Sequence, residues 1–215
     1  MDECFEIFLE QFAPQENTEL PSASQIAKFK GSVPSILINY WQKQGWGGFH
    51  EGLFWFLNPD EYRPVVDAWF DEAKIAHRDD YQVIARSAFG KIFLWNKTGG
   101  HTMIINPVFS EIITFPPEEE VASGDEDIAF EAFLVSIDPE ILDIEDAKEK
   151  LLFKRALKKL GRLKSDEMYG FEPALAIGGT ANLENLVKVK VIEHLVLLAQ
   201  MGEIEIQHMD VSRYT

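Results

Sequence analysis

Residues 81–115 read YQVIARSAFGKIFLWNKTGGHTMIINPVFSEIITF, and this stretch decides the fold. Short runs rich in β-branched and aromatic residues alternate here with turn signals at Gly90, residues 97–100 and Asn106-Pro107. Such spacing is typical of strands joined by tight turns. It predicts an antiparallel meander with strands over 83–89, 92–95, 102–105 and 111–114. We expect an α+β (mixed α/β) fold whose central antiparallel sheet is flanked by helices.

Helical patterns precede the meander. Phe5, Phe8, Leu9 and Phe12 lie on one helical face, and a polar loop is expected over 15–24. A helix is predicted over 33–44, where a proline suits the first turn and a glycine follows the last. Residues 53–57, LFWFL, predict a buried strand. The sequence NPDE (58–61) combines a cap, a proline and two acids, which predicts the start of a helix that reaches residue 73.

The part after the meander is also mixed. Apolar spacing predicts helices over 127–137 and 146–160, the second ended by Gly161. An apolar strand over 169–177 is expected to end at a glycine turn. Val187, Val191, Leu195 and Leu198 then predict a helix that continues to Gly202. The turn-rich residues 76–80 suggest two tightly packed subdomains, 1–78 and 79–215.

Composition restricts the function. The chain has 36 acidic and 20 basic residues, for a net charge of −16, which disfavours nucleic acid and anionic membranes and favours a basic partner. The only cysteine, Cys4, excludes an internal disulfide and indicates a reducing compartment. No signal peptide or membrane span is recognisable, so a cytoplasmic location is expected. A monomer is the simplest expectation.

Residues that could support catalysis are few. The HExxH, CxxC, P-loop, GxGxxG and GxSxG motifs are absent, and no two histidines have metal-ligand spacing. His50-Glu51 could be an acid/base pair or an ordinary loop. Gly178-Gly179-Thr180 could hold a phosphate or form a strand-to-helix turn. We therefore predict no catalytic residue, no metal and no cofactor.

Two groups of residues are candidates for binding a partner protein. Trp46 and Phe49 lie among glycines, where the tryptophan is either a binding anchor or part of the core. The charge is also polarised, because residues 118–149 hold 13 acids and residues 150–164 hold seven bases. Carboxylates could occupy a basic phosphate-binding site, or they could form a solvated loop and cap the next helix. The candidate contacts are Trp46, Phe49, His50, Glu118, Glu119, Glu120, Asp125, Glu126 and Asp127.

Two sets of segments resemble a known family. The first set contains PSIL (34–37), YW (40–41), GWGG (45–48), GLFW (52–55) and NP (58–59). It resembles the GAD-like domain at the N-terminus of certain type VI secretion immunity proteins. The second set contains ARSAFG (85–90), LW (94–95), LGRL (160–163), DEMYGF (166–171), PAL (173–175) and GG (178–179). It resembles the Tdi-type C-terminal domain that accompanies the GAD-like domain.

The resemblance implies a GAD-like domain over 1–78 and an immunity domain over 79–215. It further implies that the protein binds a cognate secreted toxin inside the producing cell, and that this toxin is a basic, DNA-degrading nuclease. No catalytic residue can be carried over from the family. Two alternatives stay open at this point. One is a regulatory or tRNA-related binding module, and the other is a small-molecule enzyme that uses His50, Glu51 and the Gly178-Gly179 turn.

Overall fold

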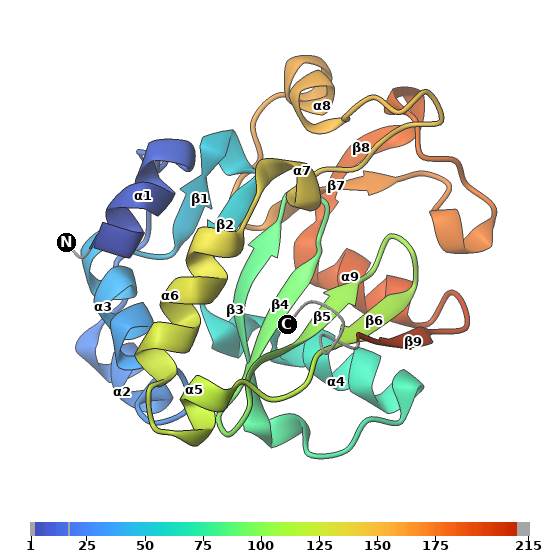
Figure 1. Cartoon of the computed structure of the whole chain (residues 1–215). Helices are drawn as coiled ribbons and strands as arrows, with labels where there is room; N and C mark the ends of the chain where they lie inside the picture. Colours follow the sequence, from blue (N-terminus) through green and yellow to red (C-terminus); the bar gives the residue numbers. More distant parts are fainter. Residues whose placement is uncertain (1–2, 17, 210–215) are drawn as a thin grey trace.

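The computed structural model describes residues 3–16 and 18–209, in which a seven-stranded sheet is surrounded by helices (Figure 1). The strand order is β1-β2-β3-β4-β5-β6-β9. These strands are β1 (Gly47–Phe49), β2 (Phe54–Phe56), β3 (Tyr81–Ser87), β4 (Ile92–Asn96), β5 (Gly100–Asn106), β6 (Glu111–Thr114) and β9 (Glu205–His208). A separate antiparallel hairpin joins β7 (Glu167–Phe171) to β8 (Leu186–Lys190).

The predicted meander is confirmed. Strands β3 to β6 pair antiparallel in sequence order, with Val83 opposite Leu94 and Ile105 opposite Ile112. The exception in the sheet is β9, which pairs parallel with β6. The mixed α+β fold with a central, mostly antiparallel sheet is therefore confirmed.

Side chains of β4 alternate between the two faces of the sheet, and both faces are buried. Phe93 and Trp95 join the core formed with α1, α3 and α6, whereas Ile92 and Leu94 join the core formed with α4 and α9. The helices are α1 (Glu3–Gln11), α2 (Ala23–Phe29), α3 (Ser35–Gln44), α4 (Arg63–Ala73), α5 (Glu119–Ala122), α6 (Glu126–Ser136), α7 (Pro139–Leu142), α8 (Phe153–Leu160) and α9 (Val191–Ala199). Figure 1 shows α6 lying across the face opposite α4.

Residues at the helix ends explain where α3 begins and ends and where α4 begins. Pro34 precedes α3, and Gly45 ends it with φ +79°, where a Cβ atom would lie 2.7 Å from the carbonyl oxygen of Glu19. The Asn58 side chain accepts a hydrogen bond from the Asp60 amide and starts a 3₁₀ turn, which leads directly into α4. Both predicted helices are present.

The helix predicted over 146–160 is correct only in its second half. It begins at Phe153, because the Asp143 carboxylate accepts hydrogen bonds from the amides of Leu152 and Phe153 at 3.1 and 2.8 Å. The Asp146 carboxylate meanwhile bonds the amides of Lys148 and Lys150 and holds the preceding residues in turns.

Two further predictions in the last third are partly wrong. The strand predicted to reach residue 177 ends at Phe171, since Pro173 offers no amide for a ladder, and residues 175–177 form a 3₁₀ turn. Residues 186–190 form β8 rather than the first turn of a helix, because their side chains alternate and their backbone pairs with β7. Helix α9 begins only at Val191.

Helix α2 and strand β9 were not predicted. In the expected loop over 15–24, position 17 lies outside the described residues, and α2 begins at Ala23. The expected subdomain boundary at 78/79 falls between α4 and β3, and strands on both sides of it belong to the same sheet. Within the described residues, no helix is both long and apolar enough to cross a bilayer.

Candidate functional site

Trp46 and Phe49 lie in the aromatic core. The Trp46 side chain is 6% exposed and packs edge-on against Trp41, and Phe49 packs edge-on against Phe54 and Phe56. The glycines around Trp46 allow the backbone of Glu19 to pair with it through two hydrogen bonds of 2.8 and 2.9 Å. Neither aromatic side chain therefore has the exposure that a partner-binding anchor needs.

His50 and Glu51 line an open groove of about 530 Å³ beside Lys154 and Arg162. The His50 Nδ1 atom forms a 2.9 Å hydrogen bond with the Gln11 carbonyl, and Glu51 lies 3.5 Å from Arg162. Gly178 and Gly179 do not line this groove; they follow a 3₁₀ turn, with φ +89° at Gly178. The convergence that the enzyme alternative requires is not found in the described part of the chain.

Two of the predicted acidic residues form hydrogen bonds within the molecule that stabilise the fold. The Asp127 carboxylate accepts a 2.9 Å hydrogen bond from the Ile36 amide, and so it caps α3 from a position 91 residues away. The Glu118 carboxylate accepts a 3.1 Å hydrogen bond from the His101 amide. Burial raises the pKa of Glu118, and the His101 amide opposes that rise. These two carboxylates are engaged within the molecule.

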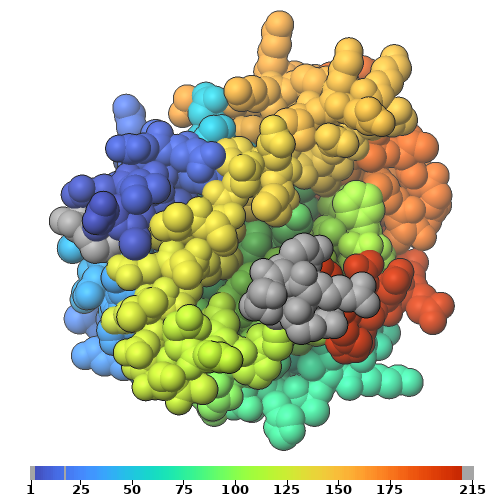
Figure 2. Space-filling view, viewed as in Figure 1, coloured from blue at the N-terminus to red at the C-terminus, as the bar shows by residue number. Residues whose placement is uncertain are grey.

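The other four predicted acidic residues, Glu119, Glu120, Asp125 and Glu126, are exposed. They lie on α5 and at the start of α6, and three exposed apolar side chains follow them along α6 and α7. Ile128 and Val135 lie two turns apart on α6 with exposures of 56% and 46%, and Ile141 on α7 is 54% exposed. We call these four carboxylates and three apolar residues the α6 face. Figure 2 shows α5, α6 and α7 as a continuous ridge across the molecule.

A partly buried histidine packs against α6. His101 lies among the rings of Phe93, Phe115 and Phe133, with 4.5 Å between its ring centroid and that of Phe133. Burial lowers the pKa of His101 to about 4, so the ring is neutral at pH 7.

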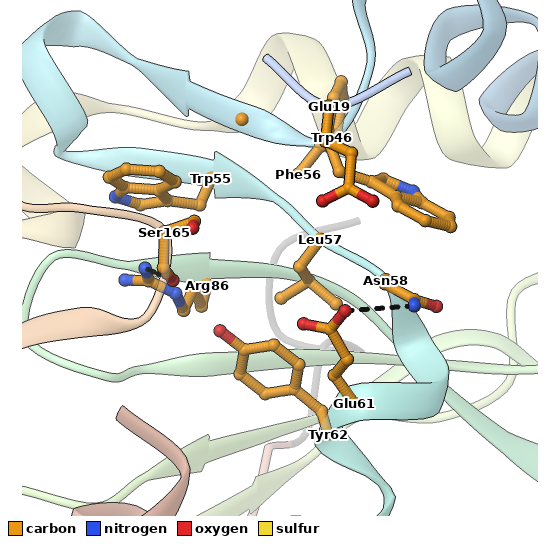
Figure 3. Close-up of a pocket in the computed structure, with 11 residues that line it drawn as sticks. Glu19, Trp46, Trp55, Phe56, Leu57, Asn58, Glu61, Tyr62, Arg86 and Ser165 are labelled. Atoms are coloured by element: carbon orange, nitrogen blue, oxygen red, sulfur yellow. Dashed lines mark hydrogen bonds between the residues drawn. The ribbon is translucent and has the colours of Figure 1, made fainter. Parts of the chain in front are cut away.

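A pocket of about 100 Å³ lies on another part of the surface, between β2, the 3₁₀ turn before α4 and the segment before β7 (Figure 3). At one end is Arg86, whose side chain is 1% exposed and lies 4.6 Å from the centroid of the Trp55 ring. Its guanidinium donates to the carbonyls of Ser87, Ser165 and Glu167 at 3.2, 2.9 and 3.1 Å. The Tyr62 hydroxyl points toward it. Burial raises the pKa of Tyr62, and the Arg86 charge opposes that rise.

Metal chemistry has no support in the described residues. No group of three or more histidine, cysteine, aspartate or glutamate side chains is placed to hold an ion there. The expectations of no metal and no cofactor remain predictions.

Sequence reasoning did not single out the two features that stand out in the structure. Ile128 belongs to the apolar pattern that predicted α6, and Val135 was not singled out. A signal was available, because α6 has apolar residues on nearly every side, and a surface helix normally has one polar face. Arg86 also carried a signal, as the only charged residue in the predicted strand over 83–89.

Comparison with known proteins gives two family matches. Residues 3–109 match the GAD-like domain, and residues 127–202 match the C-terminal domain of the type VI secretion immunity protein Tdi1. The second match supports an immunity role and implies a cognate effector as partner. The crystal structure of Atu4351 from Agrobacterium tumefaciens is similar, with a TM-score of 0.87 and 27% identity over 98% of this chain and 95% of that one. No curated protein matches the chain at a significant level.

Proposed function

Because the chain belongs to the type VI secretion immunity proteins that join a GAD-like domain to a Tdi1-type C-terminal domain, we propose that it binds and neutralises a cognate secreted effector in the producing cell. The observation that carries the proposal is the match of residues 127–202 to an immunity domain. On this proposal the effector is a basic, DNA-degrading nuclease, as the family resemblance implies.

The α6 face is our proposed docking surface for the effector. Its exposed apolar side chains supply the dehydrated centre that tight interfaces share, and its carboxylates supply a rim of the sign that a basic nuclease requires. The net charge of −16 adds long-range attraction to the same partner. On this basis, the candidate contacts keep Glu119, Glu120, Asp125 and Glu126 and gain Ile128, Val135 and Ile141.

Co-expression with the effector encoded by the neighbouring gene tests the function. Cells that produce the effector together with this chain are expected to grow and to keep intact chromosomal DNA, whereas cells with the effector alone lose both. If the chain forms no complex with the effector and gives no protection, the proposed function is wrong.

A charge-reversal variant tests the surface. Glu119, Glu120, Asp125 and Glu126 are all changed to Lys, with Asp127 left intact because it caps α3. The matched control changes Glu72, Glu149, Glu193 and Glu203 to Lys, which are exposed elsewhere and give the same change in net charge. We expect the first variant to associate with the effector at least about tenfold more slowly than the unchanged protein at low salt. The control should lose less of its association rate than the first variant does. Equal slowing in both variants would show that only net charge matters.

A further inference from the structure

Arg86 carries a buried positive charge that no carboxylate of the described residues neutralises. None of the ion pairs found in the described residues includes it. Its terminal nitrogens bond three carbonyls, but its Nε atom is buried without a hydrogen-bond partner. A guanidinium stays charged at any physiological pH, and burying an unpaired charge is costly. An anionic group at this end of the pocket would offset that cost.

The rest of the pocket has the opposite charge. Glu19 and Glu61 line it between Arg86 and Trp46, and Figure 3 shows their carboxylates on opposite sides of Leu57. Glu61 is positioned by a 3.2 Å hydrogen bond from the Asn58 amide nitrogen. At the far end, the Trp46 Nε1 atom is buried and has no hydrogen-bond partner. The pocket therefore has one cationic end, two carboxylates at its middle and an unused donor beyond them.

We infer that this pocket binds a small zwitterion, whose carboxylate contacts Arg86 and Tyr62 and whose ammonium lies beside Glu61. An anion alone would add a third negative charge beside Glu19 and Glu61, and a cation alone would leave the Arg86 charge without a counter-ion. The volume of about 100 Å³ corresponds to roughly three water molecules, which limits the ligand to the size of glycine or β-alanine. The rings of Trp55 and Tyr62 line the pocket next to Arg86.

Titration of the full chain with four probes tests the inference. Glycine and β-alanine carry both charges at different separations, acetate carries only the negative charge, and methylammonium carries only the positive one. Binding is followed by calorimetry and by the indole N–H resonances of Trp46 and Trp55. We expect a zwitterion to bind at least about tenfold more tightly than either single-charge probe, with a shift of the Trp46 resonance. Equal affinity for acetate, or no binding of either zwitterion, would overturn the inference.

Substitutions at the pocket complete the test. Arg86 also joins β3 to the segment before β7, so its replacement is avoided. Glu61→Gln removes one charge next to the ammonium, and Tyr62→Phe removes the hydroxyl beside Arg86. We expect each to weaken zwitterion binding about tenfold or more, whereas Glu203→Gln, an exposed change outside the pocket, leaves it unchanged. Unaltered affinity in both pocket variants would place the ligand elsewhere.

Discussion

The outer faces of helices α6 and α8 differ in composition, because that of α8 is charged and that of α6 is partly apolar. Helix α8 buries Phe153 and Ala156 and turns Lys154 and Lys158 toward solvent. Helix α6 buries Phe130 and Phe133 but leaves Ile128 and Val135 exposed. Both helices belong to the region matched by the immunity domain, so the difference is one within a single unit.

The difference indicates which helix has an outer face suited to solvent and which has one suited to a partner protein. In α8 charged side chains on the outer face find counter-ions within the chain, as Arg155 does with Asp146 and Lys159 does with Glu184. In α6 the exposed apolar atoms face water, and the free energy of the protein falls only when another surface covers them. The comparison therefore points to α6 as the contact surface and to α8 as an ordinary solvated helix, and four experiments can break or sharpen it.

The largest expected effect is a loss of stability at low pH, caused by His101, which packs against α6. The unfolded chain protonates His101 near its usual pKa of 6.5, but the folded chain resists protonation until about pH 4. The unfolded state thus binds more protons between these values, and stability falls as the pH drops from 6.5 to 4. The expected loss is up to about 3 kcal/mol. Urea denaturation at several pH values measures it.

His101→Phe should remove most of that dependence, since phenylalanine fits the surrounding ring cluster and does not titrate. His77→Phe, at an exposed position, is the control and should keep the slope of the unchanged protein. A His101→Phe chain with an undiminished slope would assign the acid sensitivity to other groups.

The next largest effect is on effector binding. Replacing Ile128 and Val135 together by Asp puts charges where the interface requires apolar contact. We expect the affinity for the effector to fall on the order of a hundredfold, and protection in co-expression to fail. Leu197→Asp is the control, because Leu197 is 47% exposed on α9, outside the α6 face. Tight binding by the double variant, with its helix content unchanged by circular dichroism, would contradict the proposed surface.

A smaller effect on stability should distinguish two nearby acidic residues, Asp127 and Asp125. Asp127→Ala removes the cap of α3 and is expected to lower the free energy of unfolding by about 1–2 kcal/mol. Asp125 forms no side-chain cap hydrogen bond, so Asp125→Ala should change stability by at most about 0.5 kcal/mol. Chemical denaturation of the two variants side by side provides the measurement. Equal losses would mean that the bond to Ile36 contributes nothing.

The smallest effect is expected on α8. Lys154→Glu with Lys158→Glu reverses two exposed charges on the helix that needs no partner. Effector affinity should stay within about twofold of the unchanged protein, which is typical of positions away from an interface. A loss as large as that of the α6 double variant would transfer the docking surface to α8 and reverse the comparison.

The sequence could predict elements whose signals are local. The proline and glycine at the two ends of α3, and the alternation in β4, suffice because both depend on residues within one turn or one strand. Strand β8 was missed because its apolar residues also fit the helical spacing that continues into α9, and only pairing with β7 decides between them. Strand β9 likewise depends on β6, which lies far away in the sequence.

The same limit applies to the site. The acids over 118–127 could be recognised as a group, but their division into exposed and engaged residues could not. Asp127 bonds an amide 91 residues away, and Glu118 bonds the backbone of His101 in β5. The Arg86 pocket depends on residues from five separate stretches of the chain, which the sheet and the approach to β7 bring together. Contacts of this kind appear only once the chain has folded.

The border between the two family matches has a consequence for how such genes can diversify. The GAD-like match ends at residue 109, in the turn between β5 and β6, although Ile104 and Ile105 on β5 are paired with Ile113 and Ile112 on β6. A recombination event at this border would exchange one strand of a ladder without its neighbour. Hybrids should therefore survive only when the incoming segment keeps the register of β6. Exposed side chains of α6 lie outside this ladder, so on the proposed docking surface the partner could change there while the shared sheet stays the same.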